Sequence, residues 1–149
     1  MISALVAALH FLALGIGLPS SYLRGRALKG RLDGEGLRRL FTADNVWGLA
    51  AALWIVTGLL RAFGGLEKGS AFYLASRLFW VKLDLFLLVF VLEIWPMLTF
   101  IRWRRQRRRG ELPDTSRARA LYVLTHVELA LVVVIVFVAT FMARGFAVR

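Results

Sequence analysis

The sequence predicts an all-α polytopic membrane protein, an antiparallel bundle of four transmembrane helices with both termini outside. Of its 149 residues, 59% are hydrophobic and 19% are charged. Average soluble chains are about 45–50% apolar and about 25% charged. The mean hydropathy is +0.68, and the apolar residues form long blocks separated by short basic loops. We expect one membrane domain over residues 1–149.

The first predicted span covers residues 1–19 and is apolar from its start. A secretory signal begins with a basic region and ends at a small-residue cleavage site, and neither is present here. We therefore expect a retained transmembrane helix that ends at Pro19 and the Ser20–Ser21 pair. His10 lies near its middle and is the most informative residue of the segment.

A basic segment rich in glycine follows the first span. Gly30, Gly34 and Gly36 are expected to interrupt any long helix there, because glycine is a poor helix former. Only a short interfacial helix over 36–41 is expected between them and the next span. This segment should therefore behave as a loop at the membrane surface.

The second predicted span covers residues 45–63. Thr42, Asp44 and Asn45 offer side chains that can cap its first turn. Several glycine and alanine residues within the span allow neighbouring helices to approach closely.

The third and fourth predicted spans cover residues 79–103 and 120–142. A helix rises about 1.5 Å per residue, so roughly 20 residues cross a hydrocarbon core of about 30 Å. Pro96 is expected to bend the third helix near its inner end. The loop after that helix is dominated by arginine.

The positions of the basic residues predict the orientation. They are concentrated in the first and third loops, which lie on the same side of a four-span protein, and short cytoplasmic loops are rich in lysine and arginine. We expect this side to face the cytoplasm, in the cytoplasmic (inner) membrane of a bacterium. The residues concerned are Arg24, Arg26, Lys29, Arg31, Arg38, Arg39, Arg102, Arg104, Arg105, Arg107, Arg108, Arg109, Arg117 and Arg119.

The strong positive charge does not predict nucleic-acid binding. The formal net charge is +11, but the basic residues flank apolar spans, where they meet anionic lipid headgroups. The chain has no cysteine, which excludes disulfides and thiolate metal sites. Its sequence also lacks a serine elbow, a phosphate loop and an HExxH motif.

Charged residues inside the predicted spans are the main functional signal, because they are costly in the bilayer and usually have partners. Lys82 and Glu93 are eleven positions apart and lie on nearly the same helical stripe, whereas Asp84 points to roughly the opposite side. A ligand along the helix could contact both Lys82 and Glu93. The alternative is that Lys82 and Asp84 reach the outer headgroups, where Asp84 can pair with Arg61, Arg77 or Lys68.

Glu93 lies deeper than Lys82 and needs a separate explanation. It is expected to be neutral, or paired with His126, which should lie at a similar depth on the fourth helix. A structural hydrogen bond that joins the two helices is the alternative to a ligand site. Glu128 is a further carboxylate within the fourth span.

His10 is the candidate metal ligand. A lone histidine on an apolar helix is more often a packing residue, but neutral imidazole is also a standard axial ligand of haem iron. Ligation of one haem by both His10 and His126 is a second arrangement that the sequence leaves open. The two expected depths differ by about half a helical turn to more than one turn, which weighs against that pairing.

The whole chain resembles a bacterial family of predicted membrane proteins of unknown function. More loosely, it is similar to the haem-binding membrane protoporphyrinogen oxidase family. That family has a helix-1 histidine after leucine, as in Leu9-His10. It also has a lysine in a W-x-x-K-L pattern on a later helix, and Trp80-Val81-Lys82-Leu83 is a shorter version of that pattern. The resemblance carries over to His10 and Lys82 alone.

The resemblance implies a tetrapyrrole site. Haem b would be ligated by His10, with Lys82 and Arg77 near its carboxylates and His126 and Glu93 as further candidates. The leading hypothesis is therefore a tetrapyrrole-binding membrane protein for electron transfer or porphyrinogen oxidation.

Two other hypotheses remain open. One is a non-enzymatic subunit or assembly factor that binds a membrane-complex partner or a second copy of itself. The other is a proton or ion pathway through Lys82, Glu93 and Glu128.

Overall fold

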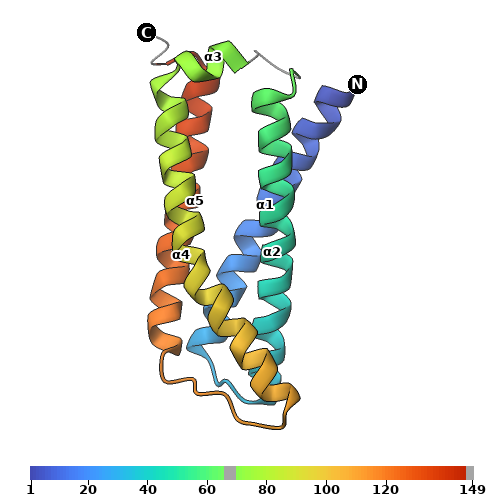
Figure 1. Ribbon diagram of the computed structural model, residues 1–149, viewed down its shortest axis with the longest axis vertical. Helices are drawn as coiled ribbons and strands as arrows, with labels where there is room; N and C mark the ends of the chain where they lie inside the picture. The colour runs from blue at the N-terminus through green and yellow to red at the C-terminus, as the bar shows by residue number, and fades with distance from the viewer. Residues whose placement is uncertain (66–69, 147–149) are drawn as a thin grey trace.

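The computed structural model describes all residues except 66–69 and 147–149 (Figure 1). Its helices are α1 (Ile2–Lys29), α2 (Gly34–Phe63), α3 (Ser70–Ala75), α4 (Arg77–Arg108) and α5 (Ala118–Ala143). The four long helices, α1, α2, α4 and α5, are long and apolar enough to cross a membrane. The predicted all-α class and the four membrane helices are therefore confirmed.

The long helices form two pairs that converge at one end. α1 packs along α2, and α5 packs against both α1 and α4. In Figure 1 the two pairs stand apart where α1 starts and α5 ends, and they come together at the opposite end. We call the first of these the outer end and the second the inner end, following the orientation expected from the basic loops.

α1 is longer than predicted, because it continues through Pro19 to Lys29. Proline removes one backbone hydrogen bond from a helix, but such breaks are tolerated in membrane helices when neighbouring groups compensate. Here the Ser20 hydroxyl donates to the carbonyl of Ile16 at 2.6 Å, beside the proline. This bond does not replace the one lost at Pro19, whose helical acceptor would be the carbonyl of Gly15. The later turns of α1 pack inside the bundle, with Ser21, Arg24 and Leu28 buried, so the helix continues and the prediction that it ends at Pro19 was wrong.

α2 also extends beyond its predicted start. It begins at Gly34, and the Asp33 side chain caps it by accepting a hydrogen bond from the backbone of Gly36. A single well-capped helix thus replaces the expected short interfacial helix. In α4, Pro96 lies inside the helix, and the half of α4 nearer the inner end slants across towards α2 in Figure 1.

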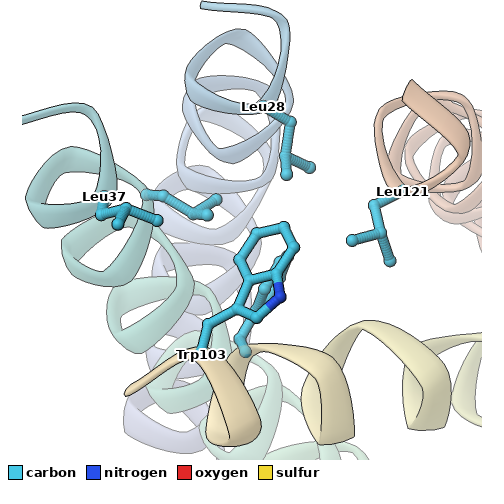
Figure 2. Close-up of a cluster of buried hydrophobic side chains, with 6 residues drawn as sticks. Leu28, Leu37, Trp103 and Leu121 are labelled. Carbon is cyan, nitrogen blue, oxygen red and sulfur yellow. The ribbon is translucent and has the colours of Figure 1, made fainter. Parts of the chain in front are cut away.

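Three apolar clusters hold the bundle together. At the inner end, all four long helices contribute to a cluster that surrounds Trp103 (Figure 2). Its members are Leu28, Leu37, Leu40, Phe100, Trp103 and Leu121. Most other large apolar side chains on these helices are exposed, as expected for surfaces that face lipid.

The other two clusters lie farther towards the outer end. Trp47, Val89, Val132 and Ile135 form a layer in the middle of the bundle, which we call the central apolar layer. Tyr73 of α3, Phe79 of α4 and Met142 of α5 form a smaller cluster at the outer end. The central apolar layer separates two polar regions, one on each side of it.

Candidate functional site

The first polar region is a cavity of about 360 Å³ near the outer end, which we call the outer cavity. Its size lies within the usual range of about 300–1,000 Å³ for small-molecule sites. Apolar side chains from the four long helices form most of its wall. Its polar and charged lining residues are His10, Trp54, Arg61, Tyr73, Lys82, Thr140 and Arg144.

The outer cavity brings together two residues that the sequence singled out. His10 comes from α1 and Lys82 from α4, and a smaller adjoining hollow of about 120 Å³ is lined by both of them as well. Among the described residues that line the outer cavity, the charged ones are all cations and none is a carboxylate. The described lining is therefore mostly apolar with cationic side chains among it.

The imidazole of His10 is held against α2 in a defined way. Its Nδ1 lies 2.9 Å from Oγ1 of Thr57, and that hydroxyl is 2.6 Å from the carbonyl of Leu53. Because the hydroxyl uses its single hydrogen on the carbonyl, it accepts from His10, and we assign the proton of neutral His10 to Nδ1. The lone pair is then on Nε2, as in histidines whose other nitrogen is oriented for metal ligation.

Two further contacts fix the plane of the His10 ring. The ring stacks on Trp54, with centroids 5.7 Å apart and an angle of 27° between the planes. A Cβ atom on Gly58 would lie 3.3 Å from Cε1 of His10, so the absence of a side chain there leaves room for the imidazole. α2 thus supplies a hydrogen-bond partner, a stacking surface and space for one histidine of α1.

Arg77 was predicted to lie near the carboxylates of a bound tetrapyrrole. It is exposed, however, and does not line the outer cavity. It is five residues from Lys82, which corresponds to about 140° around an α-helix, so the two face different directions. Arg61 of α2 lines the cavity instead, with its guanidinium 5.4 Å from the ring centre of Phe11. Arg61 is the better candidate for a cation near an acidic ligand group.

Asp84 is exposed on α4. Among the described residues, no ion pair joins it to Arg61 or Arg77, and Lys68 lies outside the described residues.

His126 lies far from the outer cavity, in the inner half of the bundle. A Cβ atom on Gly25 would lie 2.6 Å from Cε1 of His126, so α1 and α5 are in close contact there. Gly25 is fifteen residues beyond His10 on α1, which corresponds to about 22 Å along the helix. Within one copy of the bundle, His10 and His126 therefore lie too far apart to reach one iron atom.

The second polar region lies on the inner side of the central apolar layer. Arg24 of α1 is completely buried, and its guanidinium donates to both carboxylate oxygens of Glu93 on α4, at 2.5 and 2.9 Å. The same guanidinium donates to Glu128 of α5 at 2.8 Å and to Asp44 of α2 at 3.3 Å. One charged residue from each long helix therefore meets at Arg24.

Arg104 of α4 extends this group of charges. It donates to the second carboxylate oxygen of Asp44 at 2.8 Å and to the side-chain oxygen of Asn45 at 2.9 Å. We call Arg24, Asp44, Glu93, Arg104 and Glu128 the inner ionic network. Bidentate arginine–carboxylate pairs such as Arg24–Glu93 are among the stronger hydrogen-bonded contacts in proteins. Single hydrogen bonds to Glu128 and Asp44 extend the network to all four long helices.

Glu93 is thus paired with Arg24 and not with His126, as the sequence had suggested. Nδ1 of His126 lies 2.9 Å from the backbone carbonyl of Tyr122, one turn earlier on the same helix. Lys82 and Glu93 also do not face a common ligand site, since the central apolar layer lies between the outer cavity and Glu93.

The sequence alone does not point to Arg24 and Asp44 as site residues. A first helix that ends at Pro19 would leave Arg24 in a loop, and the position of Asp44 also fits a helix cap. A usable signal was present: Gly17, Ser21, Arg24 and Leu28 recur at helical spacing and form one buried face of α1.

Among the described residues, no group of three or more histidine or acidic side chains could hold a metal ion.

Comparison with known proteins agrees with the membrane architecture. A family model described as "Predicted membrane protein (DUF2214)" matches residues 2–147. No curated protein and no solved structure matches the chain. Because the family model covers nearly the whole length, the chain belongs to the DUF2214 family of predicted membrane proteins.

Proposed function

We propose that this protein binds a tetrapyrrole, with haem b as the first candidate, in the outer cavity. The observation that carries the proposal is that His10 and Lys82 line the same cavity although they are distant in sequence. These are the two residues on which the resemblance to the membrane protoporphyrinogen oxidases rests. The expected membrane is the cytoplasmic membrane of a bacterium, with the inner end towards the cytoplasm.

The residues of the outer cavity fit the chemistry of such a ligand. Nε2 of His10 would hold the iron of such a ligand, because the Thr57 hydroxyl occupies Nδ1. Lys82 and Arg61 would pair with the carboxylates, and the apolar wall would cover the macrocycle. Bound haem would supply one-electron chemistry, for electron transfer or porphyrinogen oxidation, and the protein would tune it through ligation and burial.

An absorption spectrum tests the proposal directly. Protein purified in detergent from cells supplied with haem should show a Soret band, and His10→Ala should lose it because the iron loses its axial ligand. His126→Ala is the matched control, since it removes the other histidine from a position remote from the outer cavity. Circular dichroism should show equal helix content in both variants.

Three outcomes would count against haem ligation by His10. Wild-type protein could remain colourless with haem supplied, the His10→Ala variant could keep the wild-type spectrum, or His126→Ala could lose the band while His10→Ala keeps it. A colourless protein that purifies in a stoichiometric larger complex would support the alternative of a non-enzymatic membrane subunit or assembly factor.

A further inference from the structure

We propose that the inner ionic network is a proton-binding site that holds one proton at neutral pH, carried by Glu128, and exchanges it with the inner side of the membrane. This inference concerns the region on the other side of the central apolar layer from the outer cavity. It does not depend on whether a tetrapyrrole is bound there.

The number of charges in the network requires a proton for neutrality. Three carboxylates, from Asp44, Glu93 and Glu128, face two guanidinium groups, from Arg24 and Arg104. Arginine stays protonated in proteins, so ionisation of all three acids would leave one uncompensated negative charge between the helices. Unpaired charge is very costly in such surroundings, and a single bound proton removes it.

The surrounding helices offer no other charged group that contacts these carboxylates in the described residues. The nearest additional titratable residue on α5 is His126, whose Nδ1 faces the Tyr122 carbonyl and whose ring lies against Gly25 of α1. Tyr22 of α1 approaches the ring of His126 edge-on, with centroids 6.4 Å apart. The charge balance therefore rests on the five members of the network.

Hydrogen bonding identifies Glu128 as the carrier of the proton. Both oxygens of Glu93 accept from Arg24, and the two oxygens of Asp44 accept from Arg24 and Arg104. Glu128 accepts through Oε2 only, while its Oε1 is buried without a hydrogen-bond partner in the described structure. A buried carboxylate oxygen that lacks a donor is the least favourable place for negative charge, so protonation is favoured there.

Other buried polar atoms without partners lie close to this position along the helices. They are Nε of Arg24, Oγ of Ser21 and Oγ1 of Thr125, and the Ser21 and Thr125 side chains are fully buried. Ser21 precedes Arg24 by three residues, and Thr125 precedes Glu128 by three, so each lies one turn away on the same helical face. Polar groups that outnumber their partners indicate a site that takes up a small polar species such as a proton or water.

The exposure of the network members indicates the side of exchange. Arg24 and Glu128 are 0% exposed, whereas the side chains of Asp44, Glu93 and Arg104 are 12%, 22% and 26% exposed. Towards the outer end, Val132 and Ile135 follow Glu128 on α5 and belong to the central apolar layer. A proton therefore reaches Glu128 from the inner end through Glu93 and Asp44.

Infrared spectroscopy of the full-length protein in lipid nanodiscs can count protonated carboxyl groups. The wild-type protein at neutral pH should show the C=O stretching band of one buried carboxylic acid, shifted by exchange into D₂O. Glu128→Gln, which keeps the shape of the protonated side chain, should lose this band. Glu111→Gln, which changes an exposed loop carboxylate, is the matched control and should leave it intact.

Charge counting supplies a second test that does not need the Glu128 variant to fold. Arg104→Gln leaves one guanidinium for three carboxylates, so the band should double in intensity as a second proton binds. Absence of the band in wild-type protein at neutral pH, or an unchanged band in Arg104→Gln, would overturn the proposal. Persistence of the band in folded Glu128→Gln would overturn the assignment to Glu128.

Discussion

The outer cavity and the inner ionic network both place charged side chains between the same four helices. The two regions differ in how closely those side chains are packed. The described lining of the outer cavity contains Arg61, Lys82 and Arg144 around a hollow of about 360 Å³. In the inner ionic network, opposite charges are in direct contact around Arg24, which is completely buried. The outer region has space for a ligand, whereas the inner region is filled by its own side chains.

This contrast separates the part of the bundle that stabilises the fold from the part that can bind a ligand. At the inner end, the ionic network and the Trp103 cluster join all four long helices, so changes there should affect folding. At the outer end, the helix pairs stand apart, so changes there should affect ligand binding more than folding. The following variants test this division.

The largest effect is expected for Arg24→Gln. Removing the guanidinium leaves Glu93, Glu128 and Asp44 close together without their shared cation, and breaking a buried ion pair in this way costs about 3–5 kcal/mol. The free energy of unfolding, measured by denaturant titration in detergent micelles, should fall by that amount. Arg26→Gln, an exposed neighbour on the same helix, should stay within about 0.5 kcal/mol of wild type. Equal losses in both variants would contradict the role assigned to Arg24.

An intermediate effect is expected for Gly25→Ala. The new methyl group would meet the His126 ring at 2.6 Å and push α5 away from α1. Overpacking of this kind typically costs about 1–3 kcal/mol. The double variant with His126→Ala should recover most of the loss, which a double-mutant cycle of unfolding free energies would measure. Gly15→Ala has open space around it and should be neutral or slightly stabilising, because alanine is the better helix former.

The smallest change in stability is expected for Lys82→Gln. Lys82 is half-buried at the outer cavity, and ion pairs of partly exposed lysines contribute about 0–1 kcal/mol. Its unfolding free energy should therefore differ from wild type by less than about 1 kcal/mol. Haem affinity, measured by spectroscopic titration, should weaken about tenfold through loss of one charged contact. A large loss of stability with unchanged affinity would reverse the comparison between the two regions.

The helical architecture was predictable from the sequence because it depends on local hydropathy. Each predicted span lies within one long helix, apart from Met1, which caps the first helix. The helix ends were less predictable. Gly30 ends α1 as expected, but the helix passes through Pro19, and α2 already begins at Gly34, where Asp33 caps it. Hydropathy marks where a helix must be apolar, but it does not mark how far the helix continues beyond that part.

The sites were predictable only in part, because pairing across a bundle depends on the rotation of each helix. His10 and Lys82 were selected by residue type, and the structure brings both to one cavity. Arg77 was expected near the same cavity, but it lies on another face of α4 and is exposed. Glu93 and Glu128 stand out in the sequence as acids inside predicted spans. Their common partner Arg24 does not, because it follows the expected end of the first helix and would belong to a loop.

The position of Arg24 also has a consequence for biosynthesis. A chain that is made from its N-terminus inserts Arg24 into the membrane first and Asp44 of α2 next, so the first hairpin already contains one pair of opposite charges. Glu93 and Glu128 become available only when α4 and α5 emerge from the ribosome. Before α4 is inserted, Arg24 lacks two of its three carboxylate partners. The pair with Asp44 is then the only contact of the network within the first hairpin. Insertion of the last helix adds Glu128 with its proton, so the network is balanced in charge at each stage. A chain that stops before α5 lacks one hydrogen-bond acceptor for the Arg24 guanidinium.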